Sequence, residues 1–219
     1  MSRIWITMNP DTHDFYLLES RDMAWVVVGL GNPGKEYENT RHNTGRLALQ
    51  YFSRDNGAPA WKEDKKSRAL STGIRVGREM VALILPETYM NTSGAAVRAF
   101  VKSVKAAEHL IVIQDELDMP LGSLKLSFNR GSGGHRGIES VAKAVKTKRF
   151  TRVRVGISRS TATGKLRKPV GEKDVEKFIL TEFKAHELTE LRSVFKKVGA
   201  AIEATIKDGP QAAMNTFNQ

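Results

Sequence analysis

Apolar residues along the chain follow two patterns, short continuous runs and stripes that recur every three or four positions. The runs are typical of buried strands and predict them near 25–30, 68–76, 80–85, 109–114, 122–128 and 151–158. The stripes are typical of amphipathic helices and predict them near 44–55, 92–105, 136–147 and 185–207. Strands interleaved with helices favour a layered α/β fold with a mixed sheet.

Two segments do not join this pattern. Residues 1–22 carry several acidic side chains, and they lack the features of a secretory signal or a transit peptide. We therefore predict a disordered extension over 1–22 and a single domain over 23–219, with Met23 as an alternative start. The polar stretch 159–173 contains glycine and proline and predicts a mobile flap.

Composition narrows the range of partners. The 219 residues are 40% hydrophobic and 27% charged, which is ordinary for one soluble domain with a core. The net charge of +11 favours a polyanionic partner, most often nucleic acid, with an unrelated basic surface as the alternative. The lack of cysteine excludes disulfides, thiolate zinc sites and a thiol nucleophile. No apolar run approaches the ~20 residues that a membrane span needs.

Candidate chemistry lies where two of the predicted strands end. His42 follows the strand at 25–30 after a turn-rich loop, and Asp115 directly follows the strand at 109–114. If both strand ends lie on one edge of the sheet, Asp115 can hold the His42 ring as a base. Since the chain also lacks a Gly-x-Ser-x-Gly elbow, this pair predicts a hydrolase without a side-chain nucleophile.

Two other interpretations of these segments are weaker. The run from Gly29 to Gly34 matches the G-x-G-x-x-G nucleotide motif, but a turn follows it where that motif requires a helix. The acidic cluster Asp115-Glu116-Leu117-Asp118 could hold magnesium for phosphoryl transfer. The other strand ends offer asparagine, histidine and arginine instead of further carboxylates, so metal chemistry is the less favoured alternative.

A glycine-rich loop at 131–137 opens the helix at 136–147. Its backbone N–H groups could bind a phosphate or an oxyanion, although a plain connector would look the same. Basic residues surround it with few acids, which favours a phosphate-facing patch: Lys125, Arg130, Lys143, Lys146, Lys148, Arg149, Arg152 and Arg154. Asn91 stands at a helix start, where a helix cap and a substrate contact are both open.

Together these segments resemble the bacterial-type peptidyl-tRNA hydrolase family over about residues 24–207. The matching pieces, in the family's order and spacing, are VVVGLGNPGKEYENTRHNTG (26–45), LILPETYMNTSG (83–94), IVIQDELDMPLG (111–122), GSGGHRGIES (131–140) and FTRVRVGI (150–157). The resemblance implies a monomeric, single-domain three-layer α/β/α sandwich with a mixed, mostly parallel central sheet and no cofactor or metal. It also implies an enzyme of translation that hydrolyses the ester between a peptide and the 3′-terminal ribose of tRNA. Such an enzyme recycles peptidyl-tRNA released from ribosomes. It works in the cytoplasm, or alternatively in an organelle, and has no membrane partner.

The resemblance also assigns roles to individual positions. His42 matches the catalytic base and Asp115 the carboxylate that orients it. Asn32 and Asn91 match asparagines that hold substrate and water. The remaining matches are Tyr37 and Met90 in the cleft, His135 on its rim, and Arg154 at the tRNA phosphate site.

Two positions depart from the family pattern. Arg136 replaces an asparagine that helps to place substrate and water, and an arginine cannot accept hydrogen bonds. It could contact the substrate or pair with Asp115. Ser127 stands where a basic residue is usual, so Lys125 or Arg130 would take over tRNA binding. A catalytically altered RNA-binding relative, of the intron-splicing-factor type, is therefore the alternative. The presence of His42 and Asp115 favours the enzyme.

Overall fold

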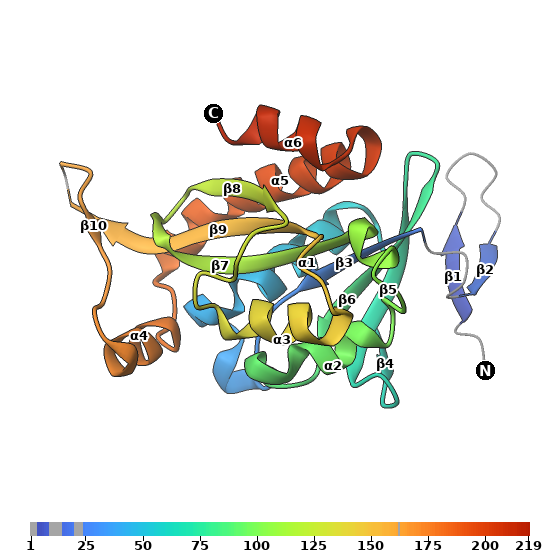
Figure 1. Ribbon diagram of the computed structural model, residues 1–219, viewed down its shortest axis with the longest axis horizontal. Coiled ribbons are helices and arrows are strands. Elements are labelled where there is room, and N and C mark those ends of the chain that lie inside the picture. The colour runs from blue at the N-terminus through green and yellow to red at the C-terminus, as the bar shows by residue number, and fades with distance from the viewer. Residues whose placement is uncertain (1–3, 9–14, 20–23, 162) are drawn as a thin grey trace.

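The protein is described here from a computed structural model, which covers residues 4–8, 15–19, 24–161 and 163–219. Eight strands of this part form one sheet (Figure 1) in the order β10-β9-β7-β3-β6-β5-β4, with β8 paired to β9. Their bounds are β3 (Trp25–Gly29), β4 (Lys62–Asp64), β5 (Ala69–Val76), β6 (Glu79–Pro86), β7 (Leu110–Pro120), β8 (Leu124–Phe128), β9 (Thr151–Ser160) and β10 (Leu166–Arg167).

The sheet is mixed, as the sequence predicted. Its central strands β9, β7, β3 and β6 run parallel, and Val27 of β3 aligns with Leu83 of β6 and Ile111 of β7. The strands β4, β5, β8 and β10 pair antiparallel. The description "mostly parallel" therefore applies to the centre, where both faces of the strands are covered and near-continuous apolar runs are expected.

Helices cover both faces of the sheet, which confirms the three-layer architecture. The helices α1 (Thr44–Asp55), α5 (Ala185–Asp208) and α6 (Pro210–Phe217) pack on the face that carries Val27. The helices α2 (Ser93–Arg98) and α3 (Arg136–Val145) pack on the other face, which carries Val26 and Val28. The period-two alternation of strand side chains thus divides the core into two layers.

Some element boundaries differ from those predicted. The helix expected over 92–105 ends at Arg98, although Val97 and Val101 are both buried at the expected spacing of four. Periodicity reports burial of the side chains and not the backbone conformation between them. The strand β4 and the helix α6 were not predicted; α6 is short and begins at Pro210 after Gly209.

The N-terminal extension contains a hairpin of β1 (Ile4–Met8) and β2 (Phe15–Glu19), which pair antiparallel. This differs from the disorder predicted for 1–22; the remainder of that segment lies outside the described residues. The hairpin forms its own two-stranded sheet, and β1 lies near β5 at one end of the molecule (Figure 1). The helix α4 (Glu172–Ile179) and β10 lie at the opposite end.

None of the helices in the described part of the chain is both long enough and apolar enough to cross a membrane.

Candidate active site

The carboxyl ends of the parallel strands β3, β6 and β7 bring separate polar segments to one edge of the sheet, the usual position of sites in open α/β sheets. A short 3-10 helix, η3 (Arg41–Asn43), carries His42 to this edge and continues into α1. Gly45 lets α1 approach the sheet, since a Cβ there would lie only 2.2 Å from the Ile113 carbonyl oxygen. His42 is thereby brought against the end of β7.

A buried ion pair fixes η3 from behind. The Arg41 side chain is fully buried, and its Nη2 donates to both carboxylate oxygens of Glu187 on α5 at 2.8 Å. Arg41 Nη1 donates to the Ile157 carbonyl oxygen at 3.2 Å. These charge-assisted hydrogen bonds orient the segment that carries His42.

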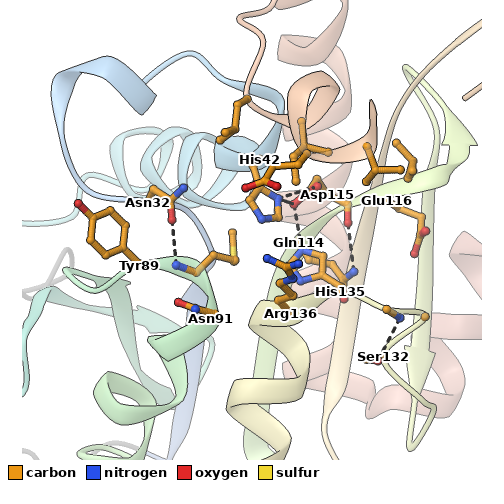
Figure 2. A pocket seen from close by; sticks show the side chains of 18 of the residues that line it. Asn32, His42, Tyr89, Asn91, Gln114, Asp115, Glu116, Ser132, His135 and Arg136 are labelled. Carbon is orange, nitrogen blue, oxygen red and sulfur yellow. Dashed lines mark hydrogen bonds and ion pairs between the residues drawn. The ribbon is translucent and has the colours of Figure 1, made fainter. Parts of the chain in front are cut away.

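His42 and Asp115 meet as the sequence predicted. The His42 Nδ1 lies 3.0 Å from both carboxylate oxygens of Asp115, and both side chains are buried. An ionised carboxylate only accepts hydrogen bonds, so Nδ1 carries the hydrogen and Nε2 keeps a lone pair. Figure 2 shows a second ring, that of His135, also directed at Asp115, with Nε2 at 3.0 Å from Oδ1.

The charges of this cluster are set by competing effects. Burial lowers the pKa of His42, but the charge of Asp115 and its hydrogen bond outweigh burial, so the pKa lies above its ordinary value of 6.5. The positive charge of Arg136 acts in the opposite direction on His42. Burial raises the pKa of Asp115, yet the two histidines hold it far below its usual range. Asp115 is therefore an anion at neutral pH.

Asn32 is held with its amide group at the edge of the same cavity. Its backbone N–H donates to Asn43 Oδ1 at 2.8 Å, and Asn43 Nδ2 donates to the Asn32 carbonyl oxygen at 2.9 Å. The Asn32 Oδ1 accepts from the Met90 N–H at 2.8 Å (Figure 2). Because Oδ1 is engaged in this way, the amide is oriented and its Nδ2 remains as the donor.

A cavity of about 430 Å³ gathers the predicted cleft residues, a volume that suits a small-molecule-sized group. Its lining includes Asn32, Tyr37, His42, Met90, Asn91, Asp115, His135 and Arg136. It is completed by Glu172, Val175, Glu176 and Ile179 of α4 and by Leu180, which directly follows this helix. Asn91 is exposed to this cavity, and Met90 is buried in its wall. All residues predicted for catalysis and substrate binding thus share one cavity.

The structure distinguishes the two alternatives for Arg136. Its guanidinium pairs with Glu172 at the start of α4, and Asp115 bonds instead to the two histidines. Both Arg136 and Glu172 are largely exposed, so water screens this pair and it contributes little to stability.

A second cavity of about 820 Å³ contains the predicted tRNA-binding residues Lys125, Arg130 and Arg154. Arg152 and Ser127 also line it, and Glu116 and Gly133 line both cavities, so the two adjoin. Glu116 pairs with Arg154 at 2.8 Å. Ser127 Oγ is buried and has no hydrogen-bond partner within the described part of the chain.

The three carboxylates considered above as a magnesium site are each bound to a different basic or histidine side chain. Glu116 pairs with Arg154, Asp118 pairs with Lys168, and Asp115 bonds to the histidines. His42, Asp115 and His135 do place potential ligand atoms within 4.8 Å of one another. Each ring, however, directs an N–H at Asp115, so neither of these nitrogens offers a lone pair to a cation.

Sequence reasoning missed several residues that shape the site. Gln114 lines the cavity, donates to the Asp115 carbonyl oxygen at 3.1 Å and accepts from Arg152 Nε at 2.7 Å. Asn43 orients Asn32, and the exposed ring of Tyr89 lines the cavity. One signal was present: Gln114 is a polar residue at the end of an otherwise apolar strand.

Comparison with known proteins identifies the family of this chain. A family model described as peptidyl-tRNA hydrolase matches residues 26–219. A peptidyl-tRNA hydrolase of Syntrophotalea carbinolica is 40% identical over 194 residues, covering 88% of this chain and 96% of the relative. One from Aquifex aeolicus is 39% identical over 195 residues, covering 89% of this chain and 96% of the relative. The crystal structure of the peptidyl-tRNA hydrolase from Acinetobacter baumannii matches with a TM-score of 0.78 and 30% identity, covering 90% of this chain and 96% of that one.

Proposed function

Because this chain belongs to the peptidyl-tRNA hydrolase family and hydrolyses the ester that joins a peptide to tRNA, we propose that His42 and Asp115 carry out that hydrolysis. The observation that carries the assignment is the hydrogen bond from His42 Nδ1 to Asp115, which leaves Nε2 as a base facing the cavity. The RNA-binding alternative receives no support from the relatives named above.

The site holds a neutral base, His42, that can activate a water molecule for attack on the ester. His42 Nε2 removes a proton from a water molecule while the water oxygen attacks the ester carbonyl carbon. Asp115 stabilises the imidazolium that forms. When the tetrahedral intermediate collapses, the bond from carbon to the ribose oxygen breaks, and that oxygen takes the proton from His42. The products are a peptide with a free carboxylate and a tRNA with a free terminal hydroxyl.

Donors around the cavity suit the oxyanion and the substrate. The oriented Nδ2 of Asn32 and the amide of Asn91 would donate to the developing oxyanion or hold the water. One such donor is typically worth ~10²–10³ in rate. Tyr37, Met90 and Arg136 would form the walls that hold the peptide end and the terminal nucleotide.

The second cavity is assigned to tRNA phosphates. Lys125, Arg130 and Arg154 supply positive charge there, which suits phosphate oxygens. A phosphate in this cavity would compete with Glu116 for Arg154. Since the two cavities adjoin, one tRNA end could occupy both. We also propose that the chain works in the cytoplasm and that it is a monomer. Sedimentation of the purified protein would test the monomeric state.

Substitution of His42 tests the assignment. His42→Ala should lower peptide release from purified peptidyl-tRNA by about 10²–10⁴-fold, the typical worth of a general base, while tRNA affinity stays nearly unchanged. His109→Ala is the matched control, because His109 is exposed, packs against the Trp25 ring in a tilted arrangement and does not line the cavity. Undiminished cleavage by His42→Ala would end the assignment, and loss of wild-type activity with EDTA would favour metal chemistry.

A further inference from the structure

His135 occupies a position that its place on the cleft rim does not explain. Its side chain is only 8% exposed and lies between the start of α3 and the Asp115 carboxylate. On one side, Nδ1 accepts from the backbone N–H groups of Gly137 at 3.1 Å and Ile138 at 3.4 Å. His135 is therefore the N-cap of α3, a position that serine, threonine, aspartate or asparagine usually fills.

The cap determines where the hydrogen of the ring lies. Because two backbone N–H groups point at Nδ1, that nitrogen must offer its lone pair, and the ring hydrogen resides on Nε2. Nε2–H then donates to Asp115 Oδ1 at 3.0 Å. Gly137 allows this close fit, since a Cβ there would lie 3.1 Å from His135 Cε1 and 2.4 Å from Met90 Sδ.

We propose that His135 is a positioning residue for the hydrolysis, which links the N-terminus of α3 to Asp115 and limits how strongly Asp115 holds a proton on His42. The proposal rests on the assignment of His42 as the base. A carboxylate that accepts from two rings shares its charge between them, and the positive end of the helix dipole supports the His135 donor. A base in this position must stay neutral near the working pH in order to accept a proton from water.

Other charged groups near the ring remain the same when His135 is changed. The titratable groups that line the cavity beside the two histidines and Asp115 are Glu116 of β7, Arg136 of α3, Glu172 and Glu176 of α4, and Tyr37 and Tyr89 in the segments that follow β3 and β6. Arg41, next to His42 in sequence, points away and pairs with Glu187. Among the described residues, the direct partners of the Asp115 carboxylate are the two histidine rings.

His135→Asn separates the two roles of this residue. Asparagine is among the best N-cap residues, so it keeps the α3 cap, but its shorter side chain withdraws the donor from Asp115. With its charge less shared, Asp115 should stabilise the His42 imidazolium more strongly. We expect the His42 titration, followed by NMR in the free protein, to move to higher pH. The acid limb of kcat/KM should move in the same direction, and kcat at its plateau should fall by about 10- to 100-fold, because a misplaced catalytic group costs up to ~10²-fold.

Two further variants make the test decisive. His135→Ala removes both the donor and the cap, so it should produce the same pH shift together with a lower melting temperature. His109→Asn, the same change at an exposed histidine, should alter neither. If the His42 titration and the acid limb stay in place or move to lower pH in folded His135→Asn, His135 is a helix cap only and the proposal is wrong. The NMR titration needs no turnover, so it tests the role of His135 separately from the proposed function. The proposed function itself would fail if the His42→Ala variant kept its activity.

Discussion

Single charges decide how the catalytic pair behaves. Burial alone would lower the pKa of His42, but the adjacent Asp115 reverses the sign, and Arg136 partly opposes Asp115. His42 is a base only while it is neutral, so activity should fall as the pH decreases through a pKa that lies above 6.5. Arg136 therefore affects the reaction through its charge, although its guanidinium pairs with Glu172.

Arg136→Asn tests this effect and restores the residue that is usual in the family. Loss of the positive charge should raise the pKa of His42, so we expect the acid limb of kcat/KM to move to higher pH while peptide release continues. Arg136→Lys keeps the charge and should leave the limb in place. If the natural protein releases no peptide and the Arg136→Asn variant does, then Arg136 itself abolishes the hydrolysis.

The sequence could predict the central pair but not every partner. His42 and Asp115 follow strand ends, and the carboxyl ends of parallel strands share an edge, so their meeting followed from order and pattern. The pairing of Arg136 with Glu172 joins a helix start to a segment beyond β10, and no periodicity fixes that distance. The double role of His135 depended on which nitrogen faces the helix, which residue spacing does not reveal.

Among the secondary-structure elements, η3 holds the base although it is only three residues long. Its position depends on α5, because Glu187 accepts from Arg41 and from the Lys184 backbone N–H at 2.8 Å each. Burial raises the pKa of Glu187, but these donors hold it below its ordinary value of 4.5. The stability that its charge contributes is complete above 4.5 and is lost as the pH falls through the lowered value.

Glu187→Ala should therefore destabilise the fold and the site together. It leaves the buried Arg41 without its counter-charge, which typically costs about 3–5 kcal/mol. We expect urea unfolding to report a loss of this size at neutral pH and a smaller one in acid, and kcat to fall because η3 carries His42. Glu203→Ala breaks the exposed pair with Lys207 on the same helix and should cost about 0.3–0.5 kcal/mol. Equal losses from the two variants would contradict the anchoring role.

At the scale of the whole molecule, the two ends of the chain differ in how they join the sheet. The strands of the β1–β2 hairpin form a separate two-stranded sheet, and the family model begins at residue 26, so we propose that 23–219 is the catalytic unit. At the other end, α6 packs on the face that carries Val27. Asn218, just beyond α6, bonds to the Leu126 backbone N–H and carbonyl at 2.7 and 3.0 Å.

A chain that starts at Met23 should keep its activity and nearly all of its melting temperature, since the hairpin forms a sheet of its own before the first strand of the main sheet and terminal truncation there is usually tolerated. A chain that ends at Gly209 lacks α6 and Asn218 and should lose both stability and tRNA affinity, because Leu126 lies in the wall of the second cavity. Peptide release and thermal unfolding of the two truncated chains would distinguish these expectations. Loss of activity on removal of 1–22 would assign a role to the hairpin.

The net charge of +11 comes from basic residues in many places, and we expect those in the second cavity to contribute most to tRNA binding. Each phosphate that the protein neutralises adds about −0.7 to −0.9 to the slope of log K against log salt. Arg154→Ala should reduce that slope by about one such unit and weaken different tRNAs to a similar extent. Arg75→Ala is the matched control, because Arg75 is exposed on β5. This strand lies toward the opposite edge of the sheet from β8 and β9, which line the second cavity. Filter binding at several salt concentrations measures the slopes. An unchanged slope for Arg154→Ala, or an equal change for Arg75→Ala, would mean that general surface charge, and not the second cavity, binds the tRNA.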